Sequence, residues 1–273
     1  MKVKAYAKIN LRLKVLGLNK EGYHLLQMVN TKIGLFDVIT IKKLTNKEIV
    51  VDMDFVPRDD NLVYKVVKKM FEEFNLPGGI YIKIKKNIPL GAGLGGGSSD
   101  AAMVILAVNK LYKLSLDKKT LQELSLLFGT DIVYCLEEGL ALVEGIGEKI
   151  TKLNRKIKSW VLIINPNIEL STKDIYTKYD LDNKYSIKNE LCEIEEMKLD
   201  ALLENDLEKV VFKEYPLVSS LKEELINSGN PLTLMSGSGS TIFVLNSPNK
   251  IRKLYKQYKS KYPNYKIYIT KIK

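Results

Sequence analysis

Residues 88–102 read IPLGAGLGGGSSDAA, and five glycines fall within the seven residues 91–97. Ordering a glycine costs more backbone entropy than ordering any other residue, so a run this dense needs a reason. An alternating stretch typical of a strand precedes it, and an apolar stretch typical of a helix follows it. The sequence therefore predicts a strand, a bare-backbone turn and a helix in direct succession.

Such a turn is a ready anion site, because backbone N–H groups and the positive end of the helix dipole converge there. Ser98 and Ser99 are expected to cap the helix, and a hydroxyl at this place could also reach a phosphate or a metal ion. A structural loop without a ligand is the alternative. The density of glycine favours the phosphate site.

Three familiar phosphate loops fit poorly. Gly91, Gly93 and Gly96 satisfy G-x-G-x-x-G, but a Rossmann site requires an acid that ends a second strand about 20 residues further on, where this chain is helical in pattern. A Walker loop requires lysine where Gly97 stands. The H-R-D and D-F-G motifs of protein kinases are absent.

The composition is that of an ordinary globular protein, with 45% hydrophobic and 27% charged residues in 273. The single histidine, His24, and two isolated cysteines, Cys135 and Cys192, argue against a zinc site and most hydrolase triads. No apolar run approaches the roughly 20 residues of a membrane span, and the start lacks the apolar core of a signal peptide. We expect a reduced, cytoplasmic protein that does not contact membranes.

Much of the formal net charge of +11 lies in residues 250–273, which hold nine basic residues, no acid and five tyrosines. This tail could be a nucleic-acid patch of cations interleaved with aromatic rings. It also reads as a helix with Ile251, Leu254 and Tyr258 on one face, followed by a strand, and this second interpretation is favoured. The excess charge would in either case attract anionic substrates.

Periodicity along the rest of the chain predicts an α+β fold rather than a regular βαβ alternation, because many strands crowd the first quarter. Residues 2–16 alternate strictly, and their polar face carries more cations than a merely wet face needs. Asp60 is expected to cap the first helix. Further strands are predicted at 36–44, 47–55, 80–89, 160–166 and 265–272, with a strand–turn–strand at 232–245. Helices are predicted at 61–74, 99–112, 117–127, 195–212, 216–228 and 249–262.

The glycine-rich stretch resembles the second motif of the GHMP kinases, a superfamily that includes galactokinase, homoserine kinase and mevalonate kinase. AKINLRLKV (7–15) resembles the first motif, and LMSGSGSTIFVL (234–245) resembles the third. The longer segment 7–29 with STKDIY (171–176) and LENDLE (203–208) is similar to the branch that acts on 4-diphosphocytidyl-2-C-methyl-D-erythritol.

The resemblance implies a two-domain GHMP-kinase fold with the active site in the cleft between the domains. It implies an N-terminal ATP-binding domain at 1–155 and a C-terminal domain at 156–273. The expected reaction is ATP-dependent, Mg²⁺-assisted phosphorylation of the substrate's 2-hydroxyl in non-mevalonate isoprenoid precursor biosynthesis. The expected partner is this cytidine diphosphate-linked small molecule and no nucleic acid, and the expected state is a monomer or weak dimer. Another small-molecule GHMP kinase and a non-catalytic nucleotide- or RNA-binding protein remain alternatives.

The resemblance also assigns the chemistry. Asp131 would accept the proton of the substrate hydroxyl, and Lys8 would keep that carboxylate ionised and stabilise charge on the phosphoryl group. From the sequence alone, Asp131 lies in a glycine-led turn where it is neither core nor cap, and Lys8, one of 39 lysines, reads as a solvated strand residue.

Substrate recognition falls, by the same resemblance, to Asn10, Tyr23, His24 and Tyr176. His24 would bond the cytosine edge while the two tyrosines clamp the ring, and only a cleft between domains is expected to join such distant residues. Asp60, Asn61 and Lys86 are weaker candidates for the adenine site. Metal ligands are unknown, with Ser99 a candidate. The phosphate cradle would comprise Pro89, Leu90, Gly91, Ala92, Gly93, Leu94, Gly95, Gly96, Gly97, Ser98 and Ser99.

Overall fold

The structure, a computed structural model, describes residues 1–53, 56–182 and 194–273. The chain forms two compact units whose segments alternate along the sequence. Unit 1 comprises Met1–Ala7, Leu35–Ile88 and Gly95–Glu138, and unit 2 comprises Lys8–Gly34, Pro89–Leu94 and Gly139–Lys273. These compact units do not correspond to the two contiguous domains, 1–155 and 156–273, that the family resemblance implies. The division into those domains stays a prediction. Cys192 lies outside the described residues.

The elements follow one another in a mixed order, as expected for an α+β fold. The strands are β1 (Lys2–Leu18), β2 (His24–Leu44), β3 (Ile49–Asp52), β4 (Gly79–Lys85), β5 (Ala141–Gly145), β6 (Lys149–Lys152), β7 (Trp160–Asn165), β8 (Glu204–Asn205), β9 (Thr233–Met235), β10 (Ile242–Asn246) and β11 (Lys266–Lys271). The helices are α1 (Leu62–Glu73), α2 (Gly96–Tyr112), α3 (Lys118–Leu126), α4 (Thr130–Leu136), α5 (Thr172–Asp182), α6 (Leu199–Leu202), α7 (Glu208–Glu214), α8 (Pro216–Asn227) and α9 (Pro248–Lys261).

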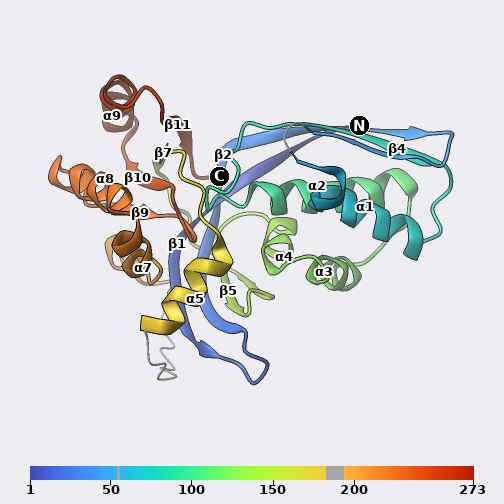
Figure 1. Ribbon diagram of the computed structural model, residues 1–273, viewed down its shortest axis with the longest axis horizontal. Helices are drawn as coiled ribbons and strands as arrows, with labels where there is room; N and C mark the ends of the chain where they lie inside the picture. Colours follow the sequence, from blue (N-terminus) through green and yellow to red (C-terminus); the bar gives the residue numbers. More distant parts are fainter. Residues whose placement is uncertain (54–55, 183–193) are drawn as a thin grey trace. The chain divides into compact units, whose positions relative to one another are not determined.

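Unit 1 is a sheet covered by helices. Its strands run in the order β3-β4-β2-β1, with β3 parallel and β2 antiparallel to β4. Helices α1 to α4 lie on one face of this sheet (Figure 1). The apolar stripe predicted for α1 is buried there through Val63, Val66, Val67 and Met70. The glycine-rich stretch leads directly into α2, the long central helix of this layer.

The start of α1 corrects one prediction. Asn61, and not Asp60, caps the helix: its side-chain oxygen accepts hydrogen bonds from the backbone N–H groups of Val63 at 2.9 Å and Tyr64 at 3.3 Å. Asp60 ends a short 3-10 turn, Arg58–Asp60. The extra turn moves the start of the helix by one residue, which places the amide side chain where the capping acceptor is needed.

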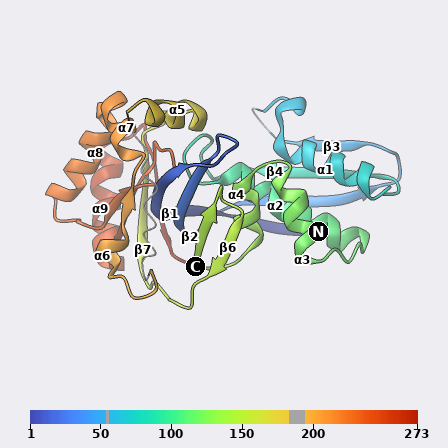
Figure 2. The ribbon, with the colours of Figure 1, turned by 90° about the horizontal axis from the view of Figure 1, so that it is seen from below.

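Unit 2 contains a four-stranded antiparallel sheet in the order β11-β7-β10-β9. Helices α8 and α9 lie on one face of it (Figure 2). Ile251, Leu254 and Tyr258 of α9 are buried against this layer, and β11 follows, so the helix-and-strand interpretation of the basic tail is confirmed. Among the described residues, no helix is both long and apolar enough to span a membrane.

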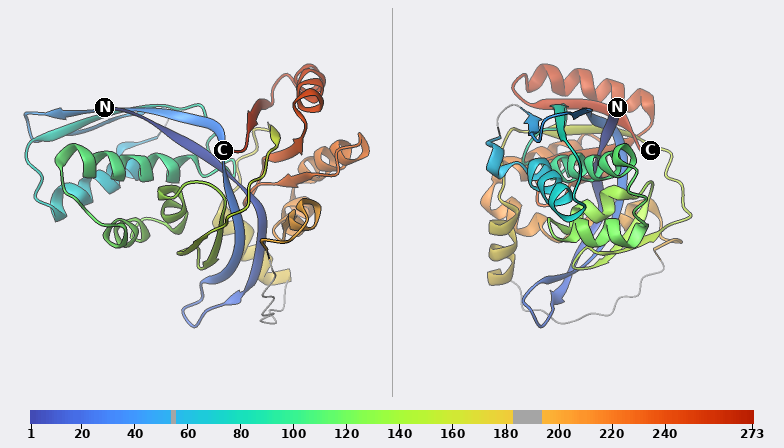
Figure 3. Two further views of the ribbon diagram at one scale, coloured as in Figure 1. Left: turned by 180° about the vertical axis from the view of Figure 1, so that it is seen from behind. Right: turned by 90° about the vertical axis from the view of Figure 1, so that its right-hand side faces the viewer.

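A β-hairpin completes unit 2. It is formed by the parts of β1 and β2 within Lys8–Gly34, which lie side by side as ribbons joined by a tight turn (Figure 3). The other ends of both strands belong to unit 1. Its flanks are β5, antiparallel to β2, and β8, parallel to β1. The part of the polar face of β1 that lies in unit 2 is buried from Lys8 to Arg12, because Lys8, Asn10 and Arg12 are each at most 5% exposed.

Strand β8 explains why a helix over 195–212 is wrong. The Asp206 backbone N–H donates to the Leu13 carbonyl at 2.9 Å, and Arg12 pairs with Glu204 at 2.8 Å. These contacts hold residues 204–205 extended beside β1, so the helical periodicity of this segment is divided between α6 and α7.

Candidate active site

The glycine-rich loop has a backbone that other residues would not adopt. Gly93 has φ +70°, and a Cβ built on it would lie 2.1 Å from the Ser236 carbonyl oxygen. Gly95 is left-handed at φ 64°, ψ 25° and forms the N-cap of α2. Both positions therefore require glycine, Gly93 also because another chain segment packs directly on it.

That neighbouring segment is the second glycine-rich stretch, residues 236–240. The Ser236 hydroxyl donates to the Gly93 carbonyl at 2.8 Å. Asn205 fixes the backbone of this stretch, because its side-chain amide donates to the carbonyls of Met235 at 2.9 Å and Gly237 at 2.8 Å. Sequence reasoning assigned no role to Asn205, although it lies within LENDLE. Two of the motifs thus meet in unit 2.

The N-terminus of α2 carries backbone donors that no side chain caps. The first bond of the α-helical ladder joins the Ser99 N–H to the Gly95 carbonyl at 2.9 Å, so the N–H groups of Gly96, Gly97 and Ser98 precede it. Gly97 is exposed, and a Cβ built on it would meet nothing within 4 Å. Packing does not require glycine here, which leaves space for a ligand against the helix end.

The two serines do not cap α2 as expected. The helix begins at Gly96, before either serine, because Gly95 reaches the left-handed region and turns the chain early. Ser99 is instead buried, and its hydroxyl donates to the Tyr6 carbonyl at 2.8 Å. Its hydroxyl oxygen therefore connects α2 to β1 within unit 1.

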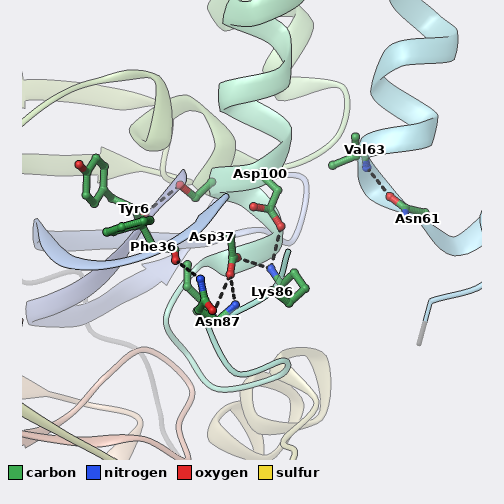
Figure 4. Close-up of polar contacts among 10 residues, drawn as sticks. Tyr6, Phe36, Asp37, Asn61, Val63, Lys86, Asn87 and Asp100 are labelled. Atoms are coloured by element: carbon green, nitrogen blue, oxygen red, sulfur yellow. Dashed lines mark hydrogen bonds and ion pairs between the residues drawn. The ribbon is translucent and has the colours of Figure 1, made fainter. Parts of the chain in front are cut away.

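A buried charge cluster lies beside this loop in unit 1 (Figure 4). The Lys86 ammonium lies 2.5 Å from Asp37 and 2.7 Å from Asp100. The other oxygen of Asp37 accepts hydrogen bonds from the backbone N–H groups of Asn87 at 2.5 Å and Ile88 at 2.9 Å. The cluster consequently fixes the residues just before the glycine loop and the second turn of the helix after it.

Burial dominates the electrostatics of the cluster. It raises the pKa of Asp100 to about 7, and the Lys86 charge only partly offsets this effect. Burial opposes the Lys86 charge, but the two carboxylates outweigh it and raise the pKa of that ammonium. Sequence reasoning considered Lys86 only as a surface or adenine-site residue and overlooked both acids. A polar residue at a fully apolar helix position, Asp100, was the available signal.

Lys8 is positioned by two hydrogen bonds of its own and by one that holds its partner Asn10, all within unit 2. Its ammonium donates to the Asn10 side-chain oxygen at 2.9 Å, and its backbone N–H donates to the Leu94 carbonyl at 2.9 Å. The Asn10 amide in turn donates to Asn30 at 2.7 Å. Lys8 is therefore not a solvated strand lysine but a buried cation whose backbone is bonded to the glycine loop.

Asp131 is half-buried in the first turn of α4, in unit 1. The expected turn is thus already a helix, and the carboxylate there also complements the helix dipole, a structural role that the sequence reading had not assigned. Lys8 belongs to unit 2. The pairing of Asp131 with Lys8 stays a prediction.

The residues expected to hold the base belong to one unit. The rings of His24 and Tyr176 lie 4.5 Å apart between centroids, tilted by 39°. The His24 Nε2 atom lies 2.7 Å from Asp180 Oδ1. All three lie in unit 2, where the hairpin brings His24 to α5. The expectation that a cleft between the two family domains joins the base-binding residues stays a prediction.

Asp180 was missed, although its spacing was a signal: four residues after Tyr176 on a helix, it shares that residue's face. Tyr23 precedes the histidine and is 58% exposed, with its ring available for contact. The described residues contain no cluster of three or more His, Cys, Asp or Glu suited to a metal. Mg²⁺ held mainly by phosphates needs only one or two carboxylates from the protein.

Both halves of the chain resemble known proteins. The sequence profile of the GHMP kinases N terminal domain matches residues 61–139, and that of the GHMP kinases C terminal domain matches residues 190–264. A 4-diphosphocytidyl-2-C-methyl-D-erythritol kinase of Clostridium botulinum is 39% identical over 99% of both chains. One of Clostridium perfringens is 38% identical over 99% of this chain and 98% of its own.

A crystal structure of 4-(cytidine 5'-diphospho)-2C-methyl-D-erythritol kinase superposes with a TM-score of 0.85 at 28% identity. The match covers 100% of this chain and 99% of the other. The resemblance seen in three short motifs thus extends over the whole sequence and the whole fold. The chain belongs to the 4-diphosphocytidyl-2-C-methyl-D-erythritol kinase family of the GHMP kinases.

Proposed function

We propose that the protein transfers the γ-phosphoryl group of ATP to the 2-hydroxyl of 4-diphosphocytidyl-2-C-methyl-D-erythritol. The products are the 2-phosphate and ADP, and the step belongs to non-mevalonate isoprenoid precursor biosynthesis. Full-length similarity to kinases named for this substrate supports the proposal. The observation that carries it in this chain is the uncapped N-terminus of α2, where Gly97 leaves open space beside backbone donors.

The nucleotide would bind through the loop from Pro89 to Ser99. Its triphosphate meets the N–H groups of Gly96, Gly97 and Ser98 and the positive end of the α2 dipole. Mg²⁺ bound to the phosphates would neutralise charge and orient the γ-phosphoryl group. Of the two serines, Ser98 is better placed to contact the phosphates or Mg²⁺, because it is only half-buried at the start of the helix. The Ser99 hydroxyl is buried and donates to the Tyr6 carbonyl.

In the chemical step, Asp131 accepts the proton of the 2-hydroxyl. The hydroxyl oxygen then forms a bond to the γ-phosphorus, and the bond between that phosphorus and the bridging oxygen breaks, releasing ADP. Lys8 stabilises negative charge on the transferring group. Asn10, held by Asn30, fixes the direction of the Lys8 ammonium through the 2.9 Å hydrogen bond.

The cytosine ring would lie against Tyr176 and Tyr23, with His24 at its edge. When the His24 Nε2–H donates to Asp180, the Nδ1 atom is left as an acceptor. An acceptor suits the amino group at position 4 of cytosine and not the carbonyl oxygen that uracil carries there. Asp180 thereby contributes to base selectivity through the orientation and tautomer of His24.

We further propose that the enzyme acts in the cytoplasm as a monomer or weak dimer without nucleic acid. An ADP-release assay tests the function directly by comparing the cytidylyl substrate with mevalonate, homoserine and galactose. Turnover with the cytidylyl substrate alone is expected. Preference for another acceptor would identify a different GHMP activity. RNA binding that weakens steeply with salt, without any ATP turnover, would overturn the assignment as a kinase.

A further inference from the structure

Unit 2 contains a cavity of about 780 Å³ that shares no lining residue with the glycine loop or with the His24 and Tyr176 pair. Two chain segments form most of its wall, residues 152–160 after β6 and residues 271–273 after β11. The volume falls within the range of small-molecule sites. None of the residues described above as catalytic, phosphate-binding or base-binding contributes to it.

The lining is strongly one-sided in charge. It contains no Asp or Glu side chain and six basic ones, Lys152, Arg155, Lys156, Lys158, Lys271 and Lys273. The guanidinium of Arg252 adds a further positive charge 5.6 Å from the Trp160 ring. A concave surface with charges of one sign concentrates the opposite ion, so the cavity attracts anions.

The lining also contains apolar residues. Leu140 and Leu153 are buried, and Ile157 and Trp160 are half-buried. An inorganic anion would pair with basic side chains but leave the apolar residues in contact with water. A neutral apolar molecule would cover the apolar residues but bring no charge to the basic side chains. The lining matches a ligand that combines both chemistries.

The walls are fixed before any ligand arrives. The Leu153 N–H donates to the Leu140 carbonyl at 3.0 Å, and the Ile272 N–H donates to the Ser159 carbonyl at 3.2 Å. The Arg155 guanidinium donates to the carbonyls of Met197 and Ile194 and so holds segment 152–160 in place. Binding in a preformed cavity does not require these backbone segments to be ordered at the moment of association.

We propose that this cavity binds a soluble organic phosphate or diphosphate with an apolar tail, at a site separate from the kinase reaction. The phosphate lies against the lysines, and the tail covers Leu140, Leu153 and Trp160. The site does not depend on the proposed kinase function. If the kinase assay fails, the cavity can still be shown to bind this ligand, and if the cavity does not bind it, the kinase function is unaffected.

Trp160 makes the test direct, because it is the only tryptophan in the chain and lines the cavity. The probe is n-hexyl phosphate, titrated while tryptophan fluorescence is recorded, with inorganic phosphate and 1-hexanol as its two halves. We expect saturable binding of hexyl phosphate at least about tenfold tighter than that of either half, because the buried CH₂ groups of the tail add to the affinity of the phosphate. Saturating ATP should leave this affinity unchanged.

The double variant Lys156→Ala/Lys158→Ala should weaken hexyl phosphate binding by about tenfold or more and leave kinase turnover unchanged. Lys253→Ala/Lys259→Ala is the matched control, because it removes the same charge from exposed positions of α9 that do not line the cavity. Ile157→Asn should weaken hexyl phosphate and spare inorganic phosphate. Equal losses in both double variants, absence of saturation, competition by ATP, or tighter binding of a single-stranded RNA oligomer would each overturn the proposal.

Discussion

The Lys86 ammonium bridges Asp37 at 2.5 Å and thereby ties the strand β2 to the chain just before the glycine loop. The same ammonium reaches Asp100 of α2 at 2.7 Å. Both ends of the phosphate-binding segment are thus anchored to one buried cation. A second oxygen of Asp100, Oδ1, is buried and has no hydrogen-bond partner among the described residues, which favours the protonated form of this carboxyl.

This anchoring predicts an unusual dependence of stability on pH. The pKa of Asp100 is raised by burial from 3.8 to about 7, so between these values the folded protein holds a proton that the unfolded chain has lost. The contribution of this group to stability therefore falls as pH rises through the window and levels off above about 7. Asp100→Asn removes it. The melting temperature of the variant relative to wild type should rise by a few degrees between pH 5 and pH 8, since about 1 kcal/mol corresponds to roughly 2–4 °C at this size.

Asp59→Asn is the control for that experiment, because Asp59 is an exposed acid of unit 1. The difference in melting temperature between Asp59→Asn and wild type should be the same at pH 5 and at pH 8. A difference that is likewise constant for Asp100→Asn would show that Asp100 is ionised in the folded protein over the whole range.

Replacing the predicted base should affect the chemical step alone. Asp131→Asn keeps the shape of the side chain but cannot accept the proton, so kcat should fall by about 10²- to 10⁴-fold while ATP affinity changes little. Loss of an acid in the first turn of α4 carries a small stability penalty, about 0.3–1 kcal/mol. Asp174→Asn is matched for this effect, because Asp174 lies exposed in the first turn of α5. Retained turnover in Asp131→Asn would remove Asp131 from the base role.

A substitution at Gly97 tests whether glycine is needed there for packing or for ligand binding. A methyl group fits there without contact, and the replacement of a helical glycine by alanine usually stabilises the helix. Gly97→Ala should therefore melt no lower than wild type and yet raise KM for ATP, because the new Cβ occupies the approach to the backbone donors. Calorimetry and steady-state kinetics measure the two effects. An unchanged KM would place the phosphates elsewhere along the loop.

Removing one wall of the base site should leave nucleotide binding intact. Tyr176→Ala is expected to raise KM for the cytidylyl substrate about 5- to 150-fold, the equivalent of one stacked ring at roughly 1–3 kcal/mol, and to spare KM for ATP. His24→Ala should act in the same direction. Equal changes for both substrates would instead point to a folding defect, which a thermal melt would reveal.

Asp180 should influence selectivity more than affinity. Asp180→Ala removes the partner of His24 Nε2, so the imidazole can present either a donor or an acceptor to the base. The ratio of kcat/KM for the cytidylyl substrate to that for its uridylyl analogue should fall, mainly through better use of the analogue. Asp180→Asn retains an acceptor for Nε2 and should restore most of the ratio. A ratio that is unchanged in both variants would exclude this role.

Local patterns predicted those elements whose stabilising contacts lie within a short segment. The strict alternation of β1, the stripe of α1 and the helix and strand of the basic tail were all read correctly. The cap at Asn61 and the strand β8 were not predicted, for different reasons. Whether Asp60 or Asn61 caps α1 depends on the conformation of a single backbone turn. Strand β8 forms only because β1 lies beside it.

The residues of the candidate site likewise include some that the sequence predicted and some that it did not. The glycine loop was evident because bare backbone is costly and therefore informative. Asn205, Asp180 and the cluster around Lys86 act through partners that are remote in sequence, and a single sequence contains no record of such pairs. The burial of Lys8 was equally hidden, because its neighbours Asn10 and Asn30 come from two different strands of the hairpin.

The interleaved segments of the two units have a consequence for synthesis on the ribosome. Every residue of unit 1 has been translated once Glu138 has been added, so this unit can mature while the remainder is still being made. The hairpin segment of unit 2 must wait much longer, because its partners include β8 and the bridge from Ile33 to Ile272. Arg12 meets its partner Glu204 only after β8 has been made, so the hairpin of unit 2 is completed by segments that leave the ribosome after all of unit 1.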